Sequence, residues 1–382
     1  MRIRVCISVA IAAVTLSLVL AIALAATSAL AFHDFGVAYC AGCHTMHNSQ
    51  NGAAIDTVHP NGNAYLLNAG NPSDTCLRCH AAYGQFAAGE GFGAGGDFYW
   101  VTRTFTWPGR TPGSTVSSTG DSHGHNVIAP TKGIARDAAL ATAPGGGAGG
   151  FSSQYLGCTS CHDPHGNQNY RLLYGSELGP KYDGTRFDFT YDAPVAKGNG
   201  RRTFTGTDGV ETNSDHTIYI SGMSDWCSNC HTRFHSERSS GLFTHPTRAM
   251  GSTIAATYNA YISSEQITGG DISTSYWGLV PFEVAAPDSN ADPLNYTQGP
   301  ASNDKVMCLT CHRSHASPFA DIARWDMGVN LISLSHPNTG DIGFVQTDVD
   351  RKYYGYTFAA TQRSLCNKCH VKDEFDHPGA TH

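Results

Sequence analysis

The chain has 382 residues and a formal net charge of −7, and 14% of its residues are charged. This acidic balance, with no basic stripe along the sequence, gives no indication of a nucleic-acid partner. Leu, Ile, Val and Phe make up only about 17% of residues 32–382, which is less than an ordinary packed domain contains. Because so little aliphatic surface can offset the entropy of ordering the chain, we expect bound prosthetic groups to supply much of the core.

The N-terminal segment is typical of an export signal. Arg2 and Arg4 precede an apolar run, which ends before the small-residue site Ala29-Leu30-Ala31. We expect residues 1–31 to be a cleaved signal peptide and residues 32–382 to form a single domain. A retained membrane anchor is the alternative. Cys6 lies before the apolar run, so lipoprotein processing is not expected.

A motif of two cysteines, separated by two residues and followed directly by histidine, begins at Cys40 and recurs five times. This is the attachment signature of c-type haem, in which both thiols add to the porphyrin and the histidine becomes an iron ligand. A zinc knuckle, a redox dithiol or a local disulfide needs no histidine at that place. The sequence therefore predicts six covalent c-type haems, with these cysteines and proximal histidines: Cys40, Cys43, His44; Cys76, Cys79, His80; Cys158, Cys161, His162; Cys227, Cys230, His231; Cys308, Cys311, His312; Cys366, Cys369, His370.

Regular secondary structure is expected to be sparse. We predict mostly coil with short helices and few small β ribbons, organised around a stack of six haems. Each motif should occupy about one helical turn, which places both thiols on one face. In chain order, the other predicted elements are a strand-like segment at 97–106, turn-rich loops at 111–121 and 144–150, a short ribbon at 203–205, and helices at 252–264, 317–327 and 359–369.

The motifs alternate in type. Their unequal spacing excludes a regular solenoid period. In the first, third and fifth motifs, which we call the odd motifs, a second histidine follows the proximal one by three residues. The second, fourth and sixth, which we call the even motifs, lack it. The chain therefore reads as three haem pairs.

The remaining histidines exceed the six needed as second ligands, whereas methionine is scarce, at 6 residues. We therefore expect bis-histidine ligation, which is usual for electron-transfer haems. A histidine three residues beyond a proximal one cannot reach the same iron, but it can bind that of a neighbouring haem. The candidate second ligands are His47, His165, His315, His125, His245 and His33, with His235 in reserve. His59, His123, His216, His336, His377 and His382 are expected to be surface or tail residues.

The sequence also resembles the OmcS-type family of outer-surface hexahaem c-type cytochromes, over essentially all of residues 32–382. Stretches between haem motifs carry part of the resemblance, which rests on these segments: Phe32-His33, Cys43-His44-Thr45-Met46-His47-Asn48-Ser49, Gly95-Gly96-Asp97-Phe98, Gly124-His125-Asn126, Cys161-His162-Asp163-Pro164-His165-Gly166, Gly222-Met223-Ser224, Pro281-Phe282-Glu283, Cys311-His312-Arg313-Ser314-His315-Ala316-Ser317 and Leu365-Cys366-Asn367-Lys368-Cys369-His370. The loops at 110–121 and 178–215 differ.

The resemblance implies subunits that stack into extracellular conducting filaments. It also implies a head-to-tail homopolymer, in which His47 binds the fifth haem, held by His312, of a neighbouring copy. The expected location is the outer cell surface or an extracellular filament. The expected partners are other copies of the chain, other multihaem cytochromes and extracellular electron acceptors.

We expect an electron-transfer protein and not an enzyme. Multihaem reductases keep one iron open, often with lysine in place of the motif histidine, whereas all six motifs here end in histidine. Two alternatives stay open: a soluble or complex-bound periplasmic electron shuttle and, less favoured, a multihaem reductase acting on a small substrate.

Overall fold

A computed structural model of the chain describes residues 40–80, 94–147, 150–176, 178–182, 184–198, 211–235, 245, 247–285, 292–293 and 295–370. Coil and turns join short elements, as predicted. The α-helices are α2 Cys40–Cys43, α3 Pro72–His80, α4 Met223–Cys227, α5 Thr232–His235, α6 Gly251–Ala260, α7 Cys308–Cys311 and α8 Gln346–Arg351. The 3₁₀ helices are η3 Phe98–Thr102, η4 Gly120–His123, η5 Pro130–Lys132, η6 Ser153–Tyr155, η7 Cys158–Ser160, η8 Tyr170–Leu172, η9 Ala320–Ile322, η10 Ile332–Leu334 and η11 Leu365–Lys368.

The haem motifs form helical turns, as predicted. The amide of the motif histidine donates to the carbonyl of the first cysteine, for example at 2.8 Å from His44 to Cys40 and at 3.0 Å from His312 to Cys308. The same bond measures 2.9–3.1 Å in the third, fourth and sixth motifs, and the second motif lies within α3. One such turn brings both cysteines and the histidine onto one side of the backbone.

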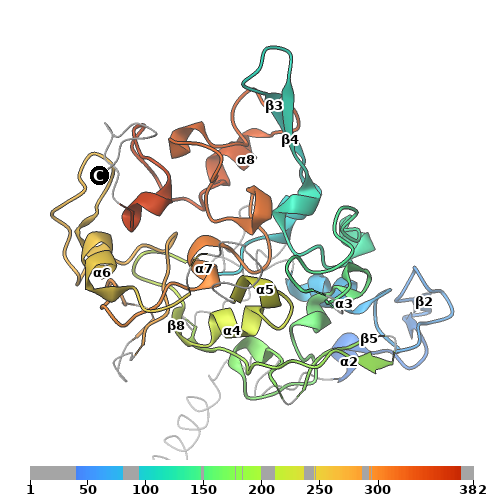
Figure 1. Cartoon of the computed structure of the whole chain (residues 1–382). Helices are drawn as coiled ribbons and strands as arrows, with labels where there is room; N and C mark the ends of the chain where they lie inside the picture. Colours follow the sequence, from blue (N-terminus) through green and yellow to red (C-terminus); the bar gives the residue numbers. More distant parts are fainter. Residues whose placement is uncertain are drawn as a thin grey trace, which may run out of the picture.

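The strands in the described residues pair as two-stranded antiparallel ribbons, which are β1 Ser49–Gln50 with β2 Ala53–Ala54, β3 Phe105–Pro108 with β4 Thr115–Ser118, β5 Lys181–Tyr182 with β6 Thr185–Arg186, and β7 Val195–Lys197 with β8 Ile218–Ser221. The β3–β4 hairpin projects from the body (Figure 1). The prediction at 97–106 was largely wrong, since Asp97 caps η3 and the strand starts only at Phe105. The loop predicted at 111–121 contains β4, and the ribbon predicted at 203–205 lies outside the described residues.

One of the three predicted helices is confirmed, since α6 covers most of 252–264. The other two were wrong. Within 317–327 the structure has only the three-residue turn η9, because Asp321 (φ 58°) and Ile322 (φ 56°) adopt left-handed conformations that end a helix. Within 359–369 only η11 forms, around the sixth motif. The loop at 144–150 consists of turns in the part that is described.

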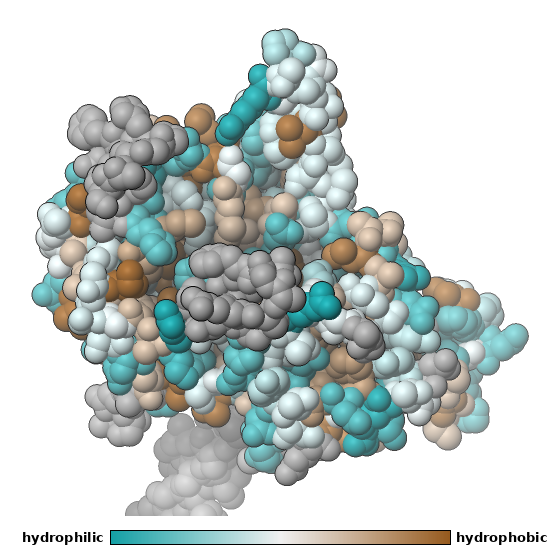
Figure 2. Space-filling view, in the orientation of Figure 1, coloured by the Kyte–Doolittle hydropathy of each residue, from teal (hydrophilic) through white to brown (hydrophobic). Residues whose placement is uncertain are grey.

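The chain contributes an aromatic core of its own. The largest hydrophobic cluster includes Tyr258, Phe282 and Trp325, all at most 1% exposed, and a second cluster surrounds Trp100 and Phe105. Aromatic rings bury much area per residue, which suits a chain poor in aliphatic side chains. On the face shown in Figure 2, apolar residues are scattered among polar ones. In the described part of the chain, no helix is long and apolar enough to cross a membrane.

Candidate haem-binding sites

The motif thiols lie in a row that follows the order of the chain. Cys76 and Cys158, from the second and third motifs, are hydrogen-bonded through their sulfurs, and so are Cys227 and Cys308, from the fourth and fifth. The Cys158 thiol thereby raises the pKa of Cys76, and Cys308 raises that of Cys227. The structure records the motif cysteines as free thiols, so no disulfide occupies the groups that would bind haem.

The other successive motifs are also close enough to interact electrostatically. Besides burial, Cys79 raises the pKa of Cys43 in the first motif, and Cys230 raises that of Cys161. Burial, followed by the thiols of the sixth motif, raises the pKa of Cys311 to about 12. In Figure 1 the same order runs from the blue N-terminal segment on the right to the red C-terminal segment on the left.

A backbone carbonyl holds the Nδ1 atom of four proximal histidines. His44 contacts the Tyr65 oxygen at 2.8 Å, His162 the Arg171 oxygen at 2.7 Å, His231 the Pro144 oxygen at 2.8 Å and His312 the Asp321 oxygen at 2.8 Å. A carbonyl only accepts, so each Nδ1 carries the proton and donates. Nε2 is then the free lone-pair nitrogen, the arrangement that metal-binding histidines adopt.

The three odd motifs share one backbone template, which we call the histidine clamp. In the fifth motif, Nδ1 of His312 donates to Asp321, the amide of Arg313 donates to Ile322 at 2.8 Å, and the amide of Arg324 donates to Cys311 at 2.8 Å. In the third motif, the carbonyls of Arg171 and Leu172 accept the first two bonds, and the amide of Tyr174 donates the third. In the first motif, Tyr65 and Leu66 are the acceptors and Asn68 is the donor. Each clamp contains residues at positive φ, among them Leu66, Arg171 and Asp321.

Four proximal histidines face a second histidine at nearly the same distance. The ring centres are 6.3 Å apart for His44 and His165, 6.4 Å for His162 and His315, 6.0 Å for His231 and His125, and 6.1 Å for His370 and His245. Imidazole binds divalent metals at about 2 Å, so two rings on opposite sides of one ion have centres roughly 6 Å apart. Each pair therefore has the spacing of a bis-histidine iron site.

His315 tests this fit most strictly, because its ring is packed from several sides. It stacks on Phe98 at 4.9 Å, and a Cβ added at Gly95 would lie 2.6 Å from its Nδ1. That Nδ1 is buried without a hydrogen-bond partner. Burial lowers the pKa of His315 to about 3, so the ring stays neutral, the form that binds a metal. These residues fit a low-spin c-type haem.

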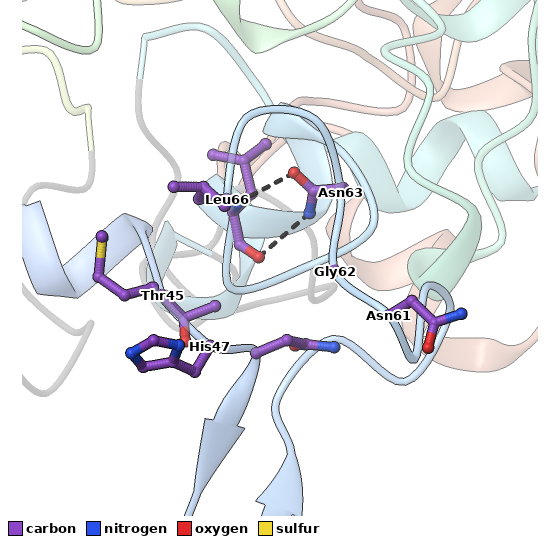
Figure 3. Close-up of a pocket in the computed structure, with 9 residues that line it drawn as sticks. Thr45, His47, Asn61, Gly62, Asn63 and Leu66 are labelled. Atoms are coloured by element: carbon purple, nitrogen blue, oxygen red, sulfur yellow. Dashed lines mark hydrogen bonds between the residues drawn. The ribbon is translucent and has the colours of Figure 1, made fainter.

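The remaining two proximal histidines are His80 and His312. His80 ends α3, and its candidate partner His33 lies outside the described residues. The ring of His312 faces no second ring in the part of the chain that the structure describes, although its Nδ1 is clamped. His47 is exposed, and Figure 3 shows its imidazole pointing away from the loop that carries Asn63. The side chain of Asn63 fixes that loop by two bonds to the backbone of Leu67.

Several other histidines have structural roles. His123 and His216, expected on the surface, are both 0% exposed, and burial lowers their pKa values. Both expectations were therefore wrong. His336 stacks on Trp107 at 3.9 Å, and His59 contacts Asp56 at 3.0 Å. The reserve candidate His235 contacts Asp225 at 2.7 Å, and His377 and His382 lie outside the described residues.

Comparison with known proteins agrees with this geometry. A family described as "Doubled CXXCH motif" matches residues 152–184, which include the third motif. The C-type cytochrome OmcS of Geobacter sulfurreducens (strain ATCC 51573 / DSM 12127 / PCA) is 33% identical over 425 residues, covering 91% of this chain and 96% of the relative.

Two solved structures match as well. One is described as cryo-EM of the OmcS nanowires from Geobacter sulfurreducens and is 31% identical. The other is described as an outer membrane cytochrome S filament from the same organism and is 30% identical. Each has a TM-score of 0.74, and each comparison covers 90% of this chain and all of the solved one. The chain belongs to the OmcS family of multihaem c-type cytochromes.

Proposed function

We propose that this chain is the subunit of an extracellular cytochrome filament, which carries electrons through six bis-histidine c-type haems to acceptors outside the cell. The observation that carries the proposal is the row of motifs, in which the thiols of successive motifs contact or interact electrostatically. Haem supplies the redox chemistry when bound, and the protein sets the order and ligation of the haems. The filaments described for the relatives support assembly of this chain into a polymer.

A threefold internal pattern supports the ligand assignment. Each repeat contains an early histidine, an odd motif with its second histidine, and an even motif. In the second repeat the early histidine, His125, faces His231 of the even motif, and in the third His245 faces His370. The same rule assigns His33 to the second haem, held by His80.

The second histidines of the odd motifs follow another rule, because each serves the preceding odd motif. His315 of the fifth motif faces His162 of the third, and His165 of the third faces His44 of the first. His47 of the first motif has no earlier odd motif in its own chain. The iron held by His312 lacks a second histidine from the described residues. The rule therefore continues from His47 to His312 of the next subunit.

A contact of this kind joins two different surfaces of the same protein. Such heterologous contacts propagate as open filaments unless the rotation between copies closes a ring. A coordinate bond at the contact would fix the register of the subunits and join the haem rows of successive copies. Other multihaem cytochromes and extracellular acceptors would receive electrons at the filament surface.

Ligation of every iron also supports a carrier and not an enzyme. A multihaem reductase needs an open iron position for its substrate, whereas this chain has a second histidine available for each of the six haems. We further propose that residues 1–31 are removed on export and that residues 32–382 act as one domain.

The test is to purify material released from cells that produce this chain and to examine it by negative-stain electron microscopy and intact mass under denaturing conditions. We expect filaments built of a chain that starts at Phe32 and carries six haem additions. Discrete particles with all six haems would instead support the periplasmic shuttle. A stoichiometric high-spin iron in assembled filaments would contradict ligation of every haem by two histidines.

A further inference from the structure

The histidine clamps provide matched positions at which the odd sites can be compared. The residue after the proximal histidine is Thr45 in the first motif, Asp163 in the third and Arg313 in the fifth. A second matched position is the residue whose backbone amide donates to the carbonyl of the second motif cysteine. This residue is Asn68 in the first motif, Tyr174 in the third and Arg324 in the fifth. The three sites share a backbone template, but they differ in the charge placed at these two positions.

Arg324 lies against the backbone of the fifth motif. It is 3% exposed, and its Nε donates to the Leu309 oxygen at 2.5 Å and to the His312 oxygen at 3.0 Å. One Nη1 bond, at 3.2 Å, reaches the Gly278 oxygen. In the first motif the matched residue, Asn68, also donates hydrogen bonds to the motif backbone but carries no charge. Its side-chain amide donates to the Ala41 and Gly42 oxygens at 3.1 Å.

Arg313 adds a second buried cation beside the same histidine. It is 4% exposed, and its guanidinium lies 4.0 Å from the centre of the Tyr354 ring. Its Nη1 donates to the Ala94 oxygen at 3.3 Å, and its Nε is buried without a partner. Neither Arg313 nor Arg324 has a carboxylate partner in an ion pair of the described residues.

These two charges persist in the folded protein. Arginine keeps its proton in proteins, so burial cannot remove the charge by titration. Neutral carbonyls and one aromatic ring satisfy part of the hydrogen-bonding capacity. Glu211 acts electrostatically on Arg313, but no carboxylate of the described residues forms an ion pair with either arginine.

We propose that Arg313 and Arg324 raise the reduction potential of the haem at the fifth motif above the potentials of the haems at the first and third motifs. This inference rests on the proposed haem ligation. An oxidised haem iron carries one more positive charge than a reduced one, so a nearby buried cation favours the reduced state. Asp163, which is 6% exposed at the matched position of the third motif, acts with the opposite sign. At the third matched position, which accepts the Nδ1 bond, Arg171 and Asp321 carry the opposite order of charge, but both are exposed, so solvent screens them more than it screens the buried Asp163, Arg313 and Arg324. The buried charges at equivalent positions therefore separate the potentials of the odd sites.

The test is a potentiometric titration of the haem-loaded protein, followed by absorbance and fitted as six one-electron steps. We expect Arg324→Gln to move one midpoint to lower potential by about 59 mV, a tenfold change in the equilibrium of electron exchange with the other haems. Arg324→Lys should keep most of the wild-type value, because the charge remains. Arg110→Gln, at an exposed arginine of the hairpin loop, is the matched control and should move no midpoint.

Two further variants test the inference even if one substituted protein fails to fold. If Arg324→Gln does not mature, Arg313→Gln decides, with the same direction expected. Asp163→Asn should move a different midpoint upward. The inference would be refuted if neither Arg324→Gln nor Arg313→Gln changed a midpoint. It would also be refuted if Arg324→Lys shifted a midpoint as much as Arg324→Gln does. The proposed ligation is checked separately in each variant by haem content and by the low-spin spectrum, which these substitutions should leave unchanged.

Discussion

The first and fifth motifs are built on the same clamp but end in opposite environments. The second histidine of the fifth motif, His315, is packed against Phe98 and faces His162, whereas its counterpart His47 is exposed and faces no ring among the described residues. Conversely, the ring of the proximal His44 has a partner ring, that of His165, at 6.3 Å, while no ring from the described part of the chain faces His312. The same clamp therefore carries a second histidine that faces another histidine inside the subunit in the fifth motif, and one that is exposed at the surface in the first. What differs is the order of the odd motifs in this sequence, since the third motif precedes His315 and no odd motif precedes that of His47.

The largest expected effect comes from removing the ligand at the open end. His47→Ala should retain six covalent haems but lose filaments, or weaken them greatly, because the junction between subunits loses its proposed coordinate bond. The isolated subunit should show about one haem in six in the high-spin state. Electron microscopy and the haem spectrum measure both effects.

His59→Ala is the matched control for this variant. His59 lies in the same segment, and its side chain pairs with Asp56. The control should still form filaments. Normal assembly of His47→Ala with every iron low-spin would show that His47 is not the bridging ligand.

The same change in the fifth motif should act inside the subunit. His315→Ala removes the proposed second ligand of the third haem and leaves a cavity beside Phe98. Because His315 is half-buried, the loss of stability should lie near the lower end of the range of about 2–5 kcal/mol that is typical of large buried side chains. We expect a high-spin haem in subunits and filaments alike, with filaments retained where the protein still folds. A high-spin signal that disappears on assembly would contradict the internal pairing of His315 with His162.

Two glycines with similar backbone conformations, one beside the fifth site and one in the β3–β4 hairpin loop, test how tightly the fifth site is packed. Gly96 has φ +84°, and a Cβ there would collide with the Ala316 oxygen. Gly113 has a similar φ of +82° but open space around it. Gly113→Ala should therefore cost only about 1 kcal/mol of backbone strain, whereas Gly96→Ala should cost several times more. Denaturant unfolding of both haem-loaded variants measures the difference, and equal costs would show that the packing around Ala316 is loose.

The smallest expected effect is a dependence on pH from Lys352, which precedes the tyrosines packed near the fifth site. Its Nζ donates to the Ser335 and Pro337 oxygens, and burial lowers its pKa to about 8. Between this value and the ordinary pKa of about 10.4, the unfolded chain binds more protons than the folded one. This lysine should therefore make the folded protein more stable as pH rises through that window.

Lys352→Met isolates this contribution from other groups that titrate at alkaline pH. The variant should lose the part of the rise in unfolding free energy between pH 8 and pH 10 that belongs to Lys352. Parallel pH profiles for the two proteins would contradict the lowered pKa.

The sequence alone was sufficient for the haem motifs and the turns they form, because attachment depends on residues within one helical turn, such as Cys308 and His312. It also indicated the pool of candidate second ligands. Their pairing was out of reach, since His125 and His231 are far apart in the chain and meet only through the fold. The buried places of His123 and His216 were missed for the same reason.

The clamps were decided by tertiary structure, because their acceptors are backbone carbonyls that any residue supplies. Asp321 and Ile322 read as part of a helix, yet they turn left-handed so that the Asp321 carbonyl meets His312. Likewise, residues 115–118 read as a loop, and they become a strand through backbone bonds to β3. Haem attachment depends on the identity and spacing of side chains within one motif, so the sequence determined it. Contacts between distant backbone atoms depend on where the whole chain is placed, and only the folded structure decided them.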